Sequence, residues 1–179
     1  YPYYRVDIFH AVDIIEDILI SYGFNNIEPQ KVEMSVVGSQ RPEVYYHDLV
    51  REGCAGLALQ ETLGYNMTSE EIQAKNMLLD PKSEGFVELE NPVSLNYAVM
   101  RKRLSPQLLS FLSKNKGAEF PQRIFEVGTC LRLEEGAENG IMQTTNLCVA
   151  STHSNVNFTE IKSILVALCK YLGVSCVVK

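Results

Sequence analysis

Apolar side chains follow two different spacings at the start of the chain. Between residues 11 and 22 they recur every three or four positions, which predicts an amphipathic helix. Gly23 stands where a glycine commonly ends a helix. Residues 4–9 alternate apolar and polar side chains instead, so we expect a strand that leads into the helix.

The segment that follows this helix lacks a regular pattern. Residues 24–41 contain an Asn-Asn pair, a proline and a short apolar alternation over 32–36, and they predict an extended connection. We therefore divide the chain into residues 1–30, the end of a preceding small domain, and residues 31–179, a main domain truncated at its C-terminus. Because the sequence begins without Met and ends on an apolar run, we expect it to be a piece of a longer chain.

The main domain mixes helical and strand patterns. Apolar spacing predicts a helix of about four turns after Pro42 and another helix over 159–172. Capping residues predict a short helix opened by Thr68 and Glu71 and a helix over 105–117 with Ser105 as its N-cap. Alternation predicts strands over 57–63, 86–90, 123–127, 129–133, 146–151 and 174–178, with a loop over 134–140. Hairpin-like strands among helices indicate an α+β domain on a largely antiparallel sheet.

Composition narrows the class of protein. With 46% apolar and 21% charged residues the chain can bury a core, and no apolar run is long enough to span a membrane. A net charge of −6 argues against capture of a phosphate backbone by this chain alone, which requires clustered Lys and Arg. Five cysteines without C-x-x-C spacing argue against a zinc site or a disulfide framework, and we expect a cytoplasmic protein.

One face of the first predicted helix is acidic. Asp13, Glu16 and Asp17 are spaced i, i+3 and i+4, and Asp7 in the preceding segment can reach the same place. Converging carboxylates repel one another unless a cation lies among them, and an all-oxygen ligand set suits Mg²⁺. Alternatively, these residues complement the helix dipole and face water. Spacing alone leaves both interpretations open.

A second candidate is the basic side chain near the end of the predicted strand pair. An inward-facing Arg132 would bind a phosphate or carboxylate with its planar guanidinium. An exposed Arg132 paired with Glu134 or Glu126 across the hairpin is the alternative. The residues alone do not decide between the two.

Three basic residues, 101–103, precede a predicted helix N-terminus and offer an anion contact, with a solvated basic loop as the alternative. The three histidines, His10, His47 and His153, lie far apart in the sequence beside no obvious nucleophile. No Gly-rich phosphate loop of the Walker or dinucleotide type is present in the sequence. We therefore assign no catalytic residue and no nucleotide-binding residue.

Several short segments match, in their residues and in their order along the chain, characteristic segments of one known family. An acidic-helix signature covers 5–17 and is followed by YGFNNIEP over 22–29. Later landmarks are ENPVS over 90–94, MRKRLSPQLL over 100–109, Asn115 and PQRIFEVG over 121–128. Their order and spacing together resemble the β subunit of phenylalanyl-tRNA synthetase, in its archaeal or eukaryotic form.

This resemblance implies a fold and a set of partners. The fold is that of class II aminoacyl-tRNA synthetases, an antiparallel sheet flanked by helices, here in a noncatalytic copy. The α subunit binds ATP and carries the reaction that attaches phenylalanine to tRNA(Phe), in a heterotetramer of two α and two β subunits. By the resemblance, Asp7, Asp13, Glu16 and Asp17 bind Mg²⁺ shared with the α subunit.

The segment 125–134 also resembles the second signature of active class II enzymes, whose arginine contacts the nucleotide's α-phosphate. That arginine would be Arg132, but no third signature follows before Lys179, so we expect Arg132 to be a remnant. The leading hypothesis is a noncatalytic module that packs apolar helix faces, such as 49–57, against the α subunit. The alternatives are an independent class II synthetase-like ligase acting through Arg132 and a metal-stabilised interaction domain outside translation.

Overall fold

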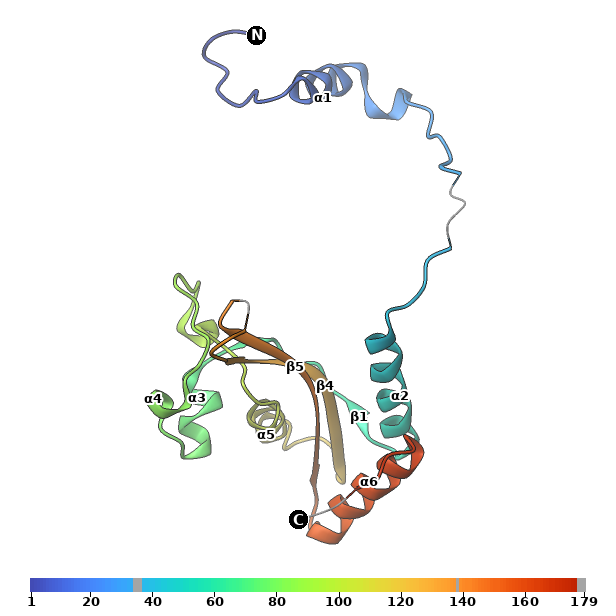
Figure 1. Cartoon of the computed structure of the whole chain (residues 1–179), viewed down its shortest axis with the longest axis vertical. Coiled ribbons are helices and arrows are strands. Elements are labelled where there is room, and N and C mark those ends of the chain that lie inside the picture. Colours follow the sequence, from blue (N-terminus) through green and yellow to red (C-terminus); the bar gives the residue numbers. More distant parts are fainter. Residues whose placement is uncertain (34–36, 138, 177–179) are drawn as a thin grey trace. The chain divides into compact units, whose positions relative to one another are not determined.

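The computed structural model describes residues 1–33, 37–137 and 139–176. Contacts divide the chain into two compact units, residues 1–39 and 40–179 (Figure 1), and each is described by itself. This division falls later in the chain than the boundary after residue 30 that the sequence pattern suggested. Parts of two predicted elements, the alternation over 32–36 and the strand over 174–178, lie outside the described residues.

The first unit is built around helix α1 (Ala11–Tyr22), which confirms the predicted helix. The helix begins with a capping box, because the His10 side chain accepts a backbone hydrogen bond from the first turn and Asp13 accepts the His10 N–H at 2.8 Å. It ends at Gly23, whose φ of 93° favours glycine. A single 3₁₀ turn, η1 (Phe24–Asn26), follows.

The predicted strand over residues 4–9 is wrong. Turns replace it, and the Arg5 N–H donates to the Pro2 carbonyl at 3.0 Å. A strand is stable only where a second strand accepts its backbone hydrogen bonds. The described residues of this unit form no such second strand, so local turns satisfy the backbone instead.

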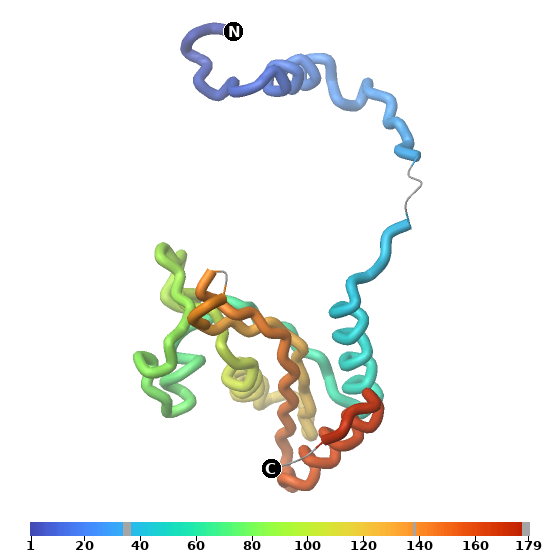
Figure 2. The backbone as a smooth tube through the Cα atoms, in the orientation of Figure 1, coloured from blue at the N-terminus to red at the C-terminus, as the bar shows by residue number. Residues whose placement is uncertain are grey.

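A long hairpin organises the second unit. Strands β4 (Gln122–Leu133) and β5 (Ile141–Thr152) pair antiparallel along their whole length, and β1 (Gln60–Glu61) pairs with β4 in the parallel direction. The two strands predicted over 123–133 are therefore one strand, β5 begins earlier than expected, and the sheet is mixed. The tube in Figure 2 shows β4 and β5 bending together along the hairpin.

One face of this hairpin packs against α2 (Pro42–Gly56) and α6 (Phe158–Tyr171). Phe125 and Val127 of β4 point to this face, as expected for side chains two positions apart on a strand. Their buried neighbours on the two helices and the connecting segment are Cys54, Leu59 and Leu168. Both helices lie close to their predicted positions.

The opposite face packs against α5 (Ser105–Lys114). Ile124 and Cys130 of β4 point to it and are buried with Leu104 and Leu108. Because β4 is covered on both sides, residues 124–127 are buried in succession, and burial does not alternate along them. The N-cap of α5 lies one residue before the predicted cap, at Leu104, so that Ser105 is the first residue of the helix. The helix ends at Lys114, before the predicted end at Gly117.

A smaller layer completes this unit. Strands β2 (Met67–Thr68) and β3 (Val99–Met100) pair antiparallel, and short helices α3 (Glu70–Gln73) and α4 (Pro81–Glu84) lie between them in the sequence. The helix cap predicted at Thr68 lies at Ser69, whose hydroxyl accepts from the backbone at 3.3 Å. Further single 3₁₀ turns are η2 (Lys75–Met77) and η3 (Leu95–Tyr97).

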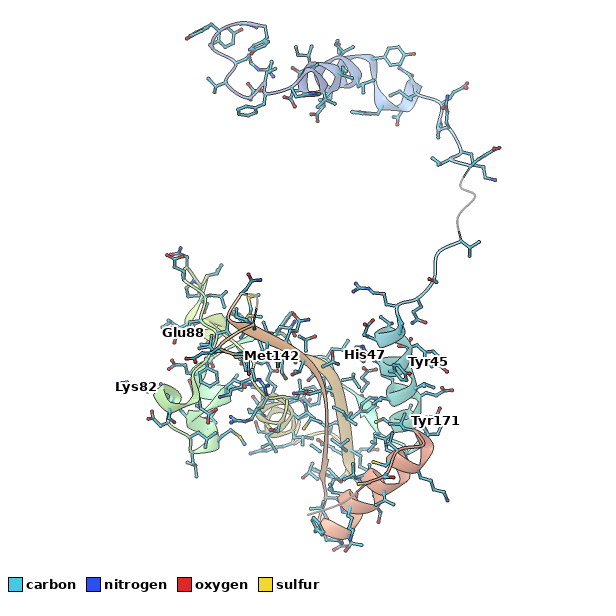
Figure 3. All side chains as sticks on the ribbon, viewed as in Figure 1. Tyr45, His47, Lys82, Glu88, Met142 and Tyr171 are labelled. Atoms are coloured by element: carbon cyan, nitrogen blue, oxygen red, sulfur yellow. The ribbon has the colours of Figure 1, made fainter. Side chains whose placement is uncertain are left out.

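Three predicted strands shrink or disappear. The strand over 86–90 is reduced to an isolated bridge at Glu88, a residue marked in Figure 3. The strand over 57–63 retains only β1, and 174–176 has no regular structure. Among the described helices, none has the length and apolar character needed to cross a membrane.

Helices α2 and α6 touch at a glycine. A Cβ atom added to Gly53 would lie 2.7 Å from Leu168 Cδ1 and 2.8 Å from Tyr171 Cδ1, closer than such atoms approach. At the same contact the Tyr171 hydroxyl donates to Glu52 at 3.2 Å, and Figure 3 marks Tyr171 where α6 meets α2. The glycine therefore sets how closely the two helices pack.

We expect Gly53→Ala to lower the free energy of unfolding by about 1–3 kcal/mol, because the methyl group would displace the packed side chains of Leu168 and Tyr171. Gly56→Ala is the matched control on the same helix, since nothing lies within 4 Å of the added atom. It should be neutral or slightly stabilising. Urea unfolding followed by circular dichroism measures both, and equal stability of the two variants would contradict the close contact.

Candidate functional site

The four acidic residues predicted to hold Mg²⁺ do not form one cluster. The Arg5 guanidinium lies between two of them, with Nη2 2.7 Å from Asp7 Oδ2 and 3.0 Å from Asp17 Oδ2. Its hydrogen bond to Asp7 is the main reason that the pKa of this carboxyl lies below its ordinary value. Arg5 thus already provides the positive charge that two of the carboxylates require.

The other two acidic residues are placed differently. Asp13 Oδ2 accepts the backbone N–H groups of Phe9 and His10, each at 2.8 Å, so it acts as a helix cap. Glu16 is exposed on α1. Over the ranges that the structure describes, no three His, Cys, Asp or Glu side chains stand together as metal ligands. This arrangement does not fit Mg²⁺ in the chain alone, and a metal shared with a partner stays a prediction.

Arg132 is exposed near the turn that connects β4 to β5. Its Nε lies 3.2 Å from Glu134 Oε2, and its Nη2 lies 3.0 Å from the sulfur of Met142 on the neighbouring strand. Met142 is marked in Figure 3. The predicted pairing with Glu134 is confirmed, while pairing with Glu126 is wrong because Glu126 lies inside the unit.

Glu126 forms a buried ion pair with Arg101, and each residue is 2% exposed. The guanidinium also donates from Nε to the Thr129 carbonyl at 2.7 Å and from Nη1 to Gln107 Oε1 at 3.1 Å. The Gly64 N–H donates to Glu126 Oε1 at 3.1 Å. Two buried charges are tolerated only when they are paired and hydrogen-bonded, and this pair satisfies both conditions.

Neither interpretation of the basic segment 101–103 holds for Arg101, which is neither an anion contact nor part of a solvated loop. A side chain at Gly128 would collide with its guanidinium, so the glycine provides the space that the ion pair occupies. One signal in the sequence could have indicated this pair. Glu126 stands between Phe125 and Val127 in an apolar strand, and a carboxylate there needs a buried cation.

The other two basic residues of this segment also pair internally. Glu84 Oε2 lies 2.8 Å from Arg103 Nη1 and 3.3 Å from Lys102 Nζ. The hydrogen bond from Arg103 is the largest cause of the lowered pKa of Glu84, and Lys102 adds to it. Gln73, fully buried, donates to the Arg103 carbonyl at 3.1 Å and accepts the Lys102 N–H at 3.1 Å. The segment is therefore held by its own unit.

A third charged cluster joins α6 to the hairpin. Glu160 accepts from Arg123 Nε and from Ser151 Oγ, each at 2.9 Å, and its other oxygen lies 2.6 Å from His153 Nε2. Arg123 is the largest cause, followed by His153, of a Glu160 pKa of about 2. Sequence reasoning gave these residues no role. Because Ser151 bonds the carboxylate and not the histidine, the cluster fastens the helix and is not a catalytic triad.

The prediction that the apolar face over 49–57 packs against a partner is wrong. Val50 and Leu57 pack against the core of their own unit. The exposed apolar side chains of α2 lie nearer its start, at Val44, Tyr45 and Tyr46, and Tyr45 is marked in Figure 3. Helix α1 also has no buried residue, and the apolar side chains exposed on it are Val12, Ile14, Ile15, Ile18, Ile20 and Tyr22.

The arrangement of helices around this hairpin is similar to a solved aminoacyl-tRNA synthetase. Desulfitobacterium hafniense PylSc, a pyrrolysyl tRNA synthetase, superposes with a TM-score of 0.58 at 18% identity, over 75% of this chain and 48% of that chain. At this identity the likeness concerns the fold. The chain therefore has an α+β fold of the class II synthetase type, in agreement with the predicted fold class.

Sequence comparisons identify the family. A family model described as the phenylalanyl tRNA synthetase beta chain CLM domain matches residues 27–179. The phenylalanine–tRNA ligase beta subunits of Pyrococcus abyssi and Thermofilum pendens are 43% and 37% identical, over 97% and 98% of this chain. The chain belongs to the phenylalanyl-tRNA synthetase β chain family, which confirms the resemblance. It spans about a third of these relatives' length, 31% of each.

We expect Arg101→Met to lower the free energy of unfolding by about 3–5 kcal/mol, because it leaves the buried Glu126 carboxylate without its cation. Arg132→Met is the matched control, since its ion pair is exposed and such pairs contribute about 1 kcal/mol or less. Chemical unfolding compares the two variants. Similar losses for both would show that the buried pair does not hold the unit together.

Glu160 should make stability depend on pH. Its folded-state pKa of about 2 lies below the 4.5 of an ordinary glutamate, so its pairing stabilises the fold above pH 4.5 and is lost as the pH falls toward 2. The Tm difference between the protein and Glu160→Gln should therefore be largest above pH 4.5 and shrink toward pH 2. Other carboxylates titrate in both proteins and cancel. Glu135→Gln, in the exposed hairpin loop, should show a small difference throughout.

Proposed function

We propose that this chain is a noncatalytic, structural part of the β subunit of phenylalanine–tRNA ligase, the enzyme that attaches phenylalanine to tRNA(Phe) with ATP. Its role is to pair with the α subunit, which binds ATP and carries the catalytic residues, in a cytoplasmic assembly of two α and two β subunits. The family match over residues 27–179 supports the subunit identity. The tRNA is then bound through the whole assembly.

The proposed noncatalytic role rests on one observation, that the basic side chains are already paired within the chain. Arg132, the residue expected to contact a nucleotide phosphate, is exposed and tied to Glu134 and Met142. Arg101, Lys102 and Arg103 each pair with a carboxylate of their own unit. Stabilising a phosphoryl group requires preorganised cations that are free to meet it, and one exposed arginine supplies little.

Exposed apolar helix surface supports the partner role. The start of α2 presents Val44, Tyr45 and Tyr46 to solvent, with the two tyrosine rings 5.9 Å apart edge to face. Obligate subunit interfaces are large and apolar, and tyrosines are enriched among the residues that dominate their binding energy. We propose that this surface of α2, and the apolar side of α1, contact the α subunit.

Magnesium enters the proposal only for the mixed assembly. In the chain alone Arg5 neutralises Asp7 and Asp17, and Asp13 caps α1. A shared site needs these carboxylates released and further ligands supplied by the partner. The chain by itself should therefore purify without bound Mg²⁺.

Co-expression with the phenylalanyl-tRNA synthetase α subunit of the same organism tests this proposal. Size-exclusion chromatography should give one peak that contains both chains, identified by mass. Tyr45→Ser and Tyr46→Ser should each weaken the complex by about tenfold or more, because they remove aromatic contact area. Tyr3→Ser is the matched control at an exposed tyrosine of the other unit.

Two separate peaks, with the chain folded, would contradict the partner role. Metal analysis of the same fractions should find Mg²⁺ in the mixed complex and none in the chain alone. Binding of ATP by the chain alone, lost in Arg132→Ala, would favour the independent ligase instead.

A further inference from the structure

The last turn of α6 carries a cysteine, and the chain reverses its direction directly after that turn. The helix ends at Tyr171, and Gly173 follows with a φ of 69°. The Gly173 N–H donates to the Lys170 carbonyl at 3.2 Å. The Val174 N–H donates to the Cys169 carbonyl at 3.0 Å. A left-handed glycine with these two hydrogen bonds is the Schellman motif, which turns the chain back at the end of its helix.

This reversal brings a second cysteine beside the first. Cys176 lies in the segment that follows the helix, and its thiol is hydrogen-bonded to the thiol of Cys169. Both residues are half-buried, and both are free thiols. The two sulfur atoms are therefore neighbours, and one of them is held on a helix.

The surroundings of this pair favour a bond between the two sulfur atoms. Such a bond brings the sulfur atoms to about 2 Å, closer than two hydrogen-bonded thiols stand. Cys176 belongs to a segment without regular structure, so it can make this adjustment while Cys169 stays on the helix. Both residues are partly accessible to a small oxidant. An accessible cysteine next to a second cysteine that resolves its oxidised form is the arrangement of redox-sensing sites.

The remaining three cysteines, which also lie in the described part of the chain, do not form such a pair. Cys54 is fully buried, and burial raises the pKa of its thiol to about 11, so it is unreactive. The sheet register places Cys130 opposite Thr144, on the same strand as Cys148. Positions 144 and 148 are about 13 Å apart along that strand, well beyond the Cα separation of about 7 Å that a disulfide allows.

We propose that Cys169 and Cys176 form a reversible disulfide when the chain meets hydrogen peroxide, and that this bond fastens the segment after α6 to the end of the helix. It goes beyond the proposed role in subunit pairing and does not depend on it. A single reversible bond also differs from the structural disulfide framework that the cysteine spacing argues against.

The bond forms in two steps. The Cys176 thiolate attacks one oxygen of the peroxide and the O–O bond breaks, so that Cys176 becomes a sulfenic acid and hydroxide leaves. The Cys169 thiolate then attacks the Cys176 sulfur, the S–S bond forms, and the S–O bond breaks with loss of a second hydroxide. The protons released by the two thiols convert both hydroxides to water. The thiols are oxidised by two electrons, and the peroxide is reduced by the same two.

The order of these steps follows from the protonation of the two thiols. Burial is the main reason, and the neighbouring Cys176 the next, that the pKa of the Cys169 thiol lies above its ordinary value. Cys169 therefore keeps its proton at neutral pH, and only the thiolate is a nucleophile. The first attack is assigned to Cys176 for this reason, and Cys169 acts as the resolving thiol.

Treatment of the fully reduced 179-residue chain with hydrogen peroxide tests the bond. Trypsin cuts after Lys170, between the two cysteines, so peptides 163–170 and 171–179 separate unless the bond joins them. Mass spectrometry of the monomer band from a nonreducing gel should find the joined peptides, lighter by two hydrogens than their sum. Dithiothreitol should release them. Absence of the joined peptides, with both thiols still reduced or either one found as its sulfinic acid, would overturn the proposal.

Hydrogen exchange tests whether the bond fastens the segment. The Val174 N–H should exchange about tenfold more slowly in the oxidised chain, because the bond suppresses opening of the turn. The Gly140 N–H, bonded to the Ala137 carbonyl at 2.9 Å in the hairpin loop, is the internal control and should not change. Equal exchange of Val174 in the reduced and oxidised chains would overturn the proposal.

Two serine variants identify the cysteine that reacts. Cys176→Ser should give no joined peptides and no slower exchange after peroxide treatment. Cys148→Ser is the matched control at another half-buried cysteine, and it should keep both effects. Slower exchange of the Val174 N–H that persists in Cys176→Ser, or that is lost in Cys148→Ser, would overturn the proposal.

Discussion

The buried ion pair between Arg101 and Glu126 is the constraint on which the second unit depends. It joins the segment before α5 to the middle of β4, and the two residues are 25 positions apart in the chain. Removing two charges from water is costly, so every neighbour that supplies a hydrogen bond must keep its place. Gly128 must stay without a side chain, because an added Cβ would lie far closer to Arg101 Nη2 than such atoms approach, and a Cβ at Gly64 would lie in tight contact with the same pair, 3.1 Å from Arg101 Nη1.

The same ion pair also distinguishes the two faces of the hairpin. In the middle of β4 one face is apolar against α2 and α6, while the other holds the ion pair beside α5. The charged groups near the centre are thus used to hold elements together. Arg132, at the far end of the hairpin, is left in solvent with an exposed acidic partner.

Internal pairing of cations recurs throughout the described residues. Arg5, Arg101, Arg103 and Arg123 each bond to a carboxylate of the same unit. With a net charge of −6 as well, these cations are not free to attract a phosphate backbone. This agrees with the role proposed above, in which apolar surface of the chain meets a partner protein and the nucleotide and nucleic acid are bound elsewhere in the assembly.

The sequence by itself determined the helices over 11–22, 42–56 and, to within one residue, 158–171, and it determined the family, because helical periodicity, caps and motif order are local properties of the chain. Only the tertiary structure decided that residues 4–9 form turns and that Arg101 is buried. A strand requires a partner strand, and the position of a buried charge depends on residues distant in the sequence. Both depend on which segments meet in space, which local patterns do not encode.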